Sequence, residues 1–535
     1  MPAIITDQYR ILNAETFIDS FVGIGASGKN NYYTFLAHPN PRNTDVKNYG
    51  FSGWGAAIPN PVDSFAQENF YYDSMLFLKK VTADDVRRVI PRINWQSGTV
   101  YDMYRNNYSG ENQYVDKNLT PQTRSTTLYG STYYVVTSEF RVYLCINNGS
   151  NPDNPDGQKS LFEPTHTNTV PQEAGNGSDG YLWKYLYTIS PSDIVKFVTT
   201  AYVPLPKEWG DATNSNIKDA AVDGKIETVV IKNGGSGYSI DDSGTVSSTG
   251  TISGIPITGD GTGGTVSINI NSGVVESIEG VVGGTGYTYA SVRFESGTFG
   301  GKTLIVGSGA EFEVVIPPKG GHGADIYREL GGFRVMLYSK YDNNVDDVPD
   351  YVVGNDFSRV GLVKNPLQFG GTDLLNNTTA TYFSALKLKP DAASGLTTSN
   401  VTYSPNTLIT QTVGVGSTAV GYVASWNPDT GILKYYQPVG FSTLSAYSYK
   451  KLDFVGLNTA ITGGSPENLV VDTTFNDKSS TVVGGKNVSL GQTFNLGKAS
   501  PDVKKYSGEI IYIDNRAPVT RTSSQKEEVK IVIEF

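Results

Sequence analysis

The stretch of this sequence nearest to a known chemical motif is GIGASGKN, residues 23–30. Phosphate-binding loops have Gly, four residues, then Gly-Lys and a Ser or Thr that holds magnesium. Asn30 stands where that hydroxyl is needed. Such a loop also follows a strand and opens a helix, whereas here a predicted helix precedes it and a strand-like run, NYYTFLAH, follows. The stretch is therefore predicted to be a turn that ends a helix.

Other residue types that perform chemistry are sparse or scattered. His38, His166 and His322 lie far apart, and none has a partner at metal-ligand spacing. The single cysteine, Cys145, excludes an internal disulfide and a cysteine-based zinc site, and we expect it to be a small apolar side chain in a strand. Paired carboxylates could serve a glycosidase, but 52 acidic residues give many chance pairs and no apolar setting singles one out. We expect no catalytic, cofactor-binding or metal-binding residues and no enzymatic activity.

Composition narrows the class of protein further. The formal net charge of −10, without clusters of Lys and Arg, disfavours a nucleic-acid partner. The sequence contains no run of about 18 apolar residues, so we expect no membrane insertion. The first residues, MPAIITDQYRILN, lack the pattern of a signal peptide. The 59 Gly, 34 Tyr and 22 Phe favour short strands and tight turns. At 535 residues we expect two to four domains.

The elements that must position any site begin with a few early helices. Asn13 is predicted to cap a helix over 14–22, and residues 62–80 to begin helical and become a strand. Thr82 is predicted to cap a helix over 83–90, because acids follow it and Pro91 ends the pattern. Ser190 is predicted to open another short helix. The region to about residue 210 therefore has an α+β pattern.

A glycine-rich internal repeat follows. IETVVIKNGGSGYS, residues 226–239, returns as VESIEGVVGGTGYT, residues 275–288. Each copy is followed by a Gly-rich turn and an apolar strand, GTGGTVSINI at 261–270 and GSGAEFEVVI at 307–316. This pattern predicts two copies of one small β unit. Low-complexity disorder is the competing interpretation, and the regular β-branched strands argue against it.

The rest of the chain has a strand pattern to its end. NPDTG, residues 427–431, is predicted to be a hairpin turn, and apolar residues alternate from 529 to 535 as in a half-buried strand. The predicted fold is mainly β, with several antiparallel sandwich or barrel-like domains. The expected domains are an α+β region at 1–210, the repeat insertion at 211–323, a β frame made of 324–371 with 500–535, and an inserted β domain at 372–499.

Three separated segments carry a resemblance to a known family. They are NPVDSFAQENFYYDSMLFLKKVTADDVRRVIPRINW, residues 60–95, SDGYLWKYLYTISP, residues 178–191, and SGEIIYIDNRAPV, residues 507–519. In this order, they resemble the dimeric baseplate wedge subunit of T-even-like contractile bacteriophage tails. The likeness covers about 9–209, 326–367 and 504–535, so that the two intervening segments look like insertions into a common frame.

The resemblance implies a structural subunit of the virion tail baseplate, assembled in the host cytoplasm, with no cofactor. It implies a homodimer that links other baseplate wedge proteins and takes part in rearrangement on contraction. Arg92 and Trp95 are expected to follow a helix end and fix the next strand, and Asn515 and Arg516 to lie in the loop between the last two strands. The structural or interface candidates from the family motifs are Arg92, Trp95, Tyr181, Trp183, Tyr185, Glu509, Tyr512, Asn515 and Arg516.

Two other classes stay open. The Gly, Thr and Tyr richness and the β repeat are also typical of a receptor-binding or tail-spike-like adhesin that binds host glycans. Such adhesins are usually trimeric with fibrous repeats, whereas this repeat has two copies in mid-chain. A glycan hydrolase is the third class, and it would need a carboxylate pair in a cleft.

Overall fold

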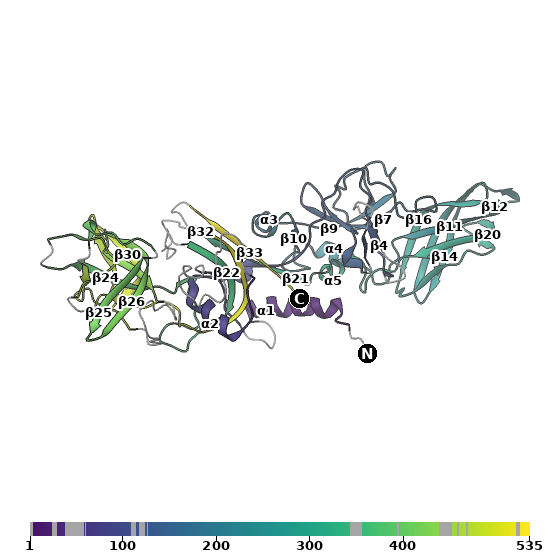
Figure 1. Cartoon of the computed structure of the whole chain (residues 1–535). Coiled ribbons are helices and arrows are strands. Elements are labelled where there is room, and N and C mark those ends of the chain that lie inside the picture. Colours follow the sequence, from purple (N-terminus) through teal and green to yellow (C-terminus); the bar gives the residue numbers. More distant parts are fainter. Residues whose placement is uncertain are drawn as a thin grey trace. The chain divides into compact units, whose positions relative to one another are not determined.

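The computed structural model separates the chain into two compact units, each assembled from distant segments. Unit 1 comprises Met1–Thr16, Arg87–Met336 and Val532–Phe535, and unit 2 comprises Phe17–Val86 and Leu337–Ile531. Most elements are antiparallel strands, as Figure 1 shows, which confirms the predicted mainly β fold. The structure describes residues 4–23, 29–37, 58, 60–108, 114–116, 123–125, 127–342, 356–392, 395–405, 407–437, 452–456, 459–466, 469–520 and 525–535.

The first helix is longer than the sequence suggested. Helix α1 runs Asp7–Val22, so it begins well before the predicted cap at Asn13. Its start is instead at Thr6, whose hydroxyl accepts a hydrogen bond from the Tyr9 amide at 3.3 Å. Gly23 ends the helix with a φ of +80°, a conformation that favours glycine. The turn predicted there is confirmed at Gly23, while residues 24–28 lie outside the described residues.

Unit 2 contains a five-stranded sheet that joins strands from distant parts of the chain. Its order is β23-β2-β1-β22-β32. Helix α2 leads directly into β2, which confirms the predicted change from helix to strand. Tyr33, Phe35 and Leu78 form part of its core. The bounds are β1 Tyr32–Ala37, α2 Phe65–Ser74, β2 Met75–Val81, β22 Asp356–Lys364, β23 Thr379–Thr381 and β32 Glu509–Thr520.

The helix predicted over 83–90 is wrong. Thr82 does form a capping box with Asp85, but the helix it opens is a single 3-10 turn, η2, Ala83–Asp85. The chain then extends as β3, Val86–Pro91, in the sheet order β10-β3-β21-β33. A β-branched run with buried neighbours on both sides favours a strand over its local helix pattern. The partners are β10 Tyr202–Pro204, β21 Arg334–Tyr341 and β33 Glu527–Glu534, and β33 confirms the predicted terminal strand.

A second sheet of unit 1 packs around a core rich in aromatic residues. The sheet β6-β7-β9-β8 carries Tyr143 and Trp183, both fully buried, and the free Cys145 is buried in β7. Helix α3 starts as predicted, because the Ser190 hydroxyl accepts from the Asp193 amide at 3.2 Å. The bounds are β4 Tyr114–Asp116, β5 Thr123–Ser125, η3 Leu128–Gly130, β6 Tyr134–Val136, β7 Arg141–Asn148, β8 Gln172–Glu173, β9 Tyr181–Thr188, α3 Pro191–Phe197, α4 Ser215–Asp219 and α5 Ile326–Glu329.

Several phenols of unit 1 are expected to make its folding sensitive to alkaline pH. Burial raises the pKa values of Tyr129, Tyr143 and Tyr327 to about 12 from an ordinary value near 10. Their stabilising contribution is complete below pH ~10, where both states are neutral, and is lost as pH rises toward ~12, because the unfolded chain ionises first. Near-ultraviolet circular dichroism should be lost across that interval while phenolate absorbance rises. Titration of all phenols near pH 10 with native dichroism retained would contradict this expectation.

The two-copy repeat predicted from the sequence is confirmed as a pair of matching β units. The repeat strand β11 pairs with β20, which follows the second copy, and the repeat strand β16 pairs with β15, which follows the first. The bounds are β11 Val229–Ser236, β12 Ser239–Asp242, β13 Thr245–Ser247, β14 Gly250–Gly259, β15 Thr262–Asn271, β16 Val274–Thr285, β17 Ala290–Val292, β18 Gly297–Phe299, β19 Lys302–Ile305 and β20 Ser308–Val314.

Equivalent residues of the two copies make equivalent contacts. The Tyr238 hydroxyl accepts from the Ala310 amide at 3.0 Å, and the Tyr287 hydroxyl accepts from the Gly264 amide at 3.1 Å. The repeated GGxGY sequence therefore packs each tyrosine over the Gly-rich turn that follows the other copy.

The segment after β23 forms a second set of strands in unit 2. Its largest sheet has the order β25-β26-β27-β24-β28, with β31 beside β24. NPDTG is the predicted hairpin turn, since Asn427 in β26 pairs with Ile432 in β27. The bounds are β24 Ser384–Pro390, η4 Thr398–Asn400, β25 Leu408–Gly414, β26 Ser417–Asn427, β27 Ile432–Tyr436, β28 Leu469–Val471, β29 Lys478–Val483, β30 Lys486–Phe494 and β31 Lys498–Ala499.

Candidate interaction surface

The motif aromatics of β9 belong to the core of unit 1. Tyr181 and Trp183 are fully buried and stacked, with ring centroids 5.2 Å apart. The Tyr181 hydroxyl donates to the Gln158 carbonyl at 2.7 Å and accepts from the Tyr101 amide at 2.9 Å. Tyr185 is half-buried, and its hydroxyl lies 2.8 Å from that of Thr188. Tyr181 and Trp183 hold the interior together and present no surface to a partner.

Arg92 and Trp95 follow a strand, β3, so the helix expected before them is wrong. The Arg92 guanidinium donates to the Thr199 carbonyl at 3.1 Å and to Asn94 Oδ1 at 2.7 Å. The Trp95 indole donates to Ser160 Oγ at 3.0 Å. Both side chains tie the segment after β3 to other parts of unit 1.

The other four candidates lie along β32 in unit 2. Asn515 and Arg516 are in the middle of this strand, so the loop expected for them is wrong. Asn515 is the cross-strand partner of Arg359, whose fully buried guanidinium donates to Asn515 Oδ1 at 3.0 Å. DNRAP has the residue types of a turn, but this bond uses the asparagine side chain within the sheet.

The remaining β32 candidates sit nearer to solvent. Arg516 is exposed and pairs with Asp514 at 2.5 Å. Glu509 is also exposed and accepts from Lys364 at 2.9 Å, while Tyr512 is half-buried. The nine predicted residues are therefore divided between the two units. In unit 1, Tyr181 and Trp183 belong to one hydrophobic core and Trp95 and Tyr185 pack against it, whereas the four candidates of unit 2 lie along β32.

Neighbouring residues of β32 offer a matched pair of substitutions. Asn515→Ala removes an acceptor from a buried guanidinium, and hydrogen bonds to charged groups contribute about 1.5–3 kcal/mol. We expect a loss of that size in the free energy of unfolding, measured by urea denaturation. Arg516→Ala, at an exposed ion pair, is the control and should change it by less than about 0.5 kcal/mol. Equal losses for both variants would contradict the assignment.

A pocket of about 560 Å³ in unit 1 is the surface feature that sequence reasoning missed. Residues between 8 and 15 of α1 form one wall, and Trp209 and the segment 324–328 form the other, with Lys218 of α4 beside them. Ile11 is buried, whereas Tyr9 and Leu12 are 54% and 55% exposed. The exposed apolar residues continue toward the chain start at Ile4 and Ile5.

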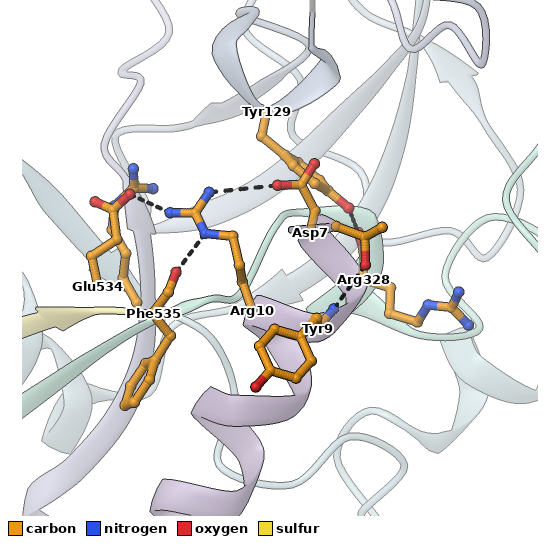
Figure 2. Close-up of polar contacts among 9 residues, drawn as sticks. Asp7, Tyr9, Arg10, Tyr129, Arg328, Glu534 and Phe535 are labelled. Carbon is orange, nitrogen blue, oxygen red and sulfur yellow. Dashed lines mark hydrogen bonds and ion pairs between the residues drawn. The ribbon is translucent and has the colours of Figure 1, made fainter. Parts of the chain in front are cut away.

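The first turns of α1 are anchored on the end of the chain, as Figure 2 shows. The Arg10 guanidinium donates to the Phe535 carbonyl and to the Glu534 carboxylate, each at 2.5 Å, and lies 3.8 Å from the centre of the Phe333 ring. Arg334 donates to the other oxygen of Glu534 at 2.9 Å. Burial opposes ionisation of Glu534, but the charges and hydrogen bonds of Arg334 and Arg10 lower the pKa of its carboxyl.

The walls of the pocket are fixed by hydrogen bonds and stacking. The Trp209 indole donates to the Gly323 carbonyl at 2.9 Å, and the Tyr327 hydroxyl donates to the Pro206 carbonyl at 3.0 Å. The Arg88 guanidinium stacks 3.9 Å from the centre of the Tyr327 ring. These aromatic walls therefore stay in place without an occupant.

Some of the charged groups around the pocket have partners within the chain, and others have no carboxylate partner among the described residues. Glu15 lies 3.9 Å from Arg88, and Asp325 caps α5 by accepting from the amides of Tyr327 and Arg328. Lys218 and Arg328 are exposed, and neither has a carboxylate partner among the residues that the structure describes. The pocket thus has aromatic and other apolar residues in its walls, beside two exposed cations that no described carboxylate neutralises.

The part of the chain that the structure describes is rich in β-strands. It contains no group of three or more His, Cys, Asp or Glu that could hold a metal ion. Within the same residues, no helix is long and apolar enough to cross a membrane. The features that remain are an interior packed with aromatic residues and a preformed surface pocket.

Residues 3–221 match the family model described as bacteriophage T4 Gp8, a baseplate wedge protein. That family is structural rather than enzymatic, and the match supports a structural protein of the phage baseplate. It bears out the localisation predicted from the sequence, the tail baseplate of a virion. No curated protein matches the chain. The α1 side of the pocket lies inside the matched region, and the 324–328 side lies outside it.

Proposed function

We propose that this chain is a wedge subunit that forms a homodimer and links neighbouring wedge proteins in the tail baseplate. In that role it takes part in baseplate assembly and in the rearrangement that accompanies contraction. The segments 211–323 and 372–499 are insertions in its frame, and the buried motif residues, such as Trp183 and Asn515, are structural. The observation that carries the proposal is the match of residues 3–221 to the Gp8 family.

The geometry described above is consistent with a structural role. Several motif residues make internal contacts. Tyr181 and Trp183 stack in the core, and Asn515 accepts a buried hydrogen bond from Arg359 on the neighbouring strand. Exposed apolar side chains gather near the start of the chain at Ile4, Ile5 and Tyr9. Exposed apolar surface of this kind is typical of sites that contact other proteins.

The solution mass of the purified full chain tests the homodimer. We expect light scattering to give twice the 57.7 kDa of the chain over a range of concentrations. A monomer at all concentrations would refute the dimer, and a stable trimer would favour the adhesin class instead. Native mass spectrometry of the chain mixed with the other purified wedge proteins of the same virion tests the linking role, which fails if no mixed complex forms.

A further inference from the structure

We propose that the pocket between α1 and the segment 324–328 binds a segment of another baseplate protein that carries both acidic and apolar side chains. This inference rests on the proposed structural role and names the chemistry of one partner contact. It is drawn from the size of the pocket, its apolar walls and the two exposed cations, Lys218 and Arg328.

The size and walls of the pocket suit several apolar side chains. Its volume of about 560 Å³ falls within the range of about 300–1,000 Å³ typical of ligand pockets. Leu12 and Tyr9 supply half-exposed apolar surface on the helix side, and Trp209 and Tyr327 face the same space. Because internal hydrogen bonds already fix both aromatic rings, binding would cost little ordering of the pocket itself.

The charges select an acidic occupant. The two pocket carboxylates are engaged, since Glu15 lies near Arg88 and Asp325 caps the amides of α5. Lys218 Nζ donates to the Trp209 carbonyl at 3.4 Å. Neither Lys218 nor Arg328 has a carboxylate partner among the described residues, so both cations can meet carboxylates brought by a partner. An apolar segment without acids would leave these cations beside a low-dielectric contact, which is unfavourable.

A second copy of this chain is the less suitable occupant. A two-fold contact places the same patch of both copies against itself. If it were centred on this pocket, Lys218 and Arg328 would face the same cations of the other copy. Like charges brought together at an interface disfavour association, so the occupant is assigned to a different protein.

The test uses an array of overlapping 12-residue peptides from the other wedge proteins of the same virion, probed with the full chain. Bound peptides should combine Asp or Glu with Leu, Ile, Phe or Tyr, and the strongest should be remeasured in solution by fluorescence anisotropy. Replacing its acids with Asn or Gln should weaken binding at least fivefold. Absence of any bound peptide, or equal binding of the neutral version, overturns the proposal.

Variants of the full chain identify the pocket as the binding site. Lys218→Glu with Arg328→Glu should weaken the peptide at least tenfold, and so should Leu12→Ser, an exposed site that does not disturb the core. The matched control is Lys319→Glu with Lys486→Glu, at two exposed lysines that do not line the pocket, which should bind within twofold of the wild type. Equal binding by the pocket variants and the wild type overturns the proposal.

Solution mass separates this inference from the proposed function. Pocket variants that keep the dimer and bind no peptide support the inference. If instead they become monomers, the pocket is a contact between copies and the assignment to a different protein is wrong. A wild-type chain that binds the acidic peptides but is trimeric, or forms no complex with the wedge proteins, refutes the proposed function while the pocket chemistry stands.

Discussion

Replacing His322 with Leu is expected to lower the free energy of unfolding of unit 1 by about 3–5 kcal/mol, the cost of removing one member of a buried pair. His322 Nδ1 lies 2.5 Å from Glu329 Oε1, and both side chains are almost completely buried. The other Glu329 oxygen accepts from the Gly323 amide at 2.8 Å. The carboxylate accepts both bonds, which requires the imidazole proton on Nδ1. Without the ring, a buried carboxylate loses one of its two partners.

Hydrogen exchange measured by mass spectrometry over residues 322–330, together with urea denaturation, would quantify this loss. His322→Asn keeps a donor near Nδ1 and should recover part of it. Arg293→Ala is the matched control, because the Arg293–Glu295 pair is 59% and 55% exposed, and it should cost less than about 0.5 kcal/mol. Adding Glu329→Leu to His322→Leu should be less damaging than the two single losses summed. A loss below about 1 kcal/mol for His322→Leu would show that the pair does not stabilise the unit.

Features with a local signal could be predicted from the sequence. The hairpin turn at NPDTG is one such feature, because Asn, Pro, Asp and Gly set the turn directly. The repeated GGxGY is another, because the turn demands a conformation that favours glycine. At Gly235 φ is +63°, and an added Cβ would lie 2.4 Å from the Ser308 carbonyl oxygen. A few adjacent residues determine these turn conformations, so they can be recognised in the sequence.

Features decided by distant partners could not be predicted. The capping box at Thr82 is real, yet β3 extends after one turn because it lies between β10 and β21. Asn515 resembles a turn residue until Arg359, 156 positions away, is placed opposite it. The pocket is formed by α1, Trp209 and the segment 324–328. No sequence pattern in any of these segments predicts that they lie close together.

Deleting Lys530–Phe535 is expected to prevent the sheet β10-β3-β21-β33 from folding. The deletion removes most of the ladder of β33 beside β21 and the buried Ile531, and loss of a buried isoleucine alone costs about 2–5 kcal/mol. It also removes Glu534 and the Phe535 carbonyl, so Arg10 loses two of its acceptors and Arg334 loses its bond to Glu534. Together these losses reach the range of about 5–15 kcal/mol that stabilises a typical domain.

The truncated chain should be found in the insoluble fraction or, where soluble, should lack protection in hydrogen exchange over β3 and β21. Ile531→Asp places a charge at a buried position of the same strand and should reproduce much of the defect. Lys526→Ala is the control in the segment just before β33, because its ion pair with Asp342 is exposed on the lysine side, and it should leave folding intact. A soluble truncated chain with native exchange protection would mean that the last strand is an accessory. Helix α1 would then have to be held by contacts other than those of Arg10 with Glu534 and Phe535.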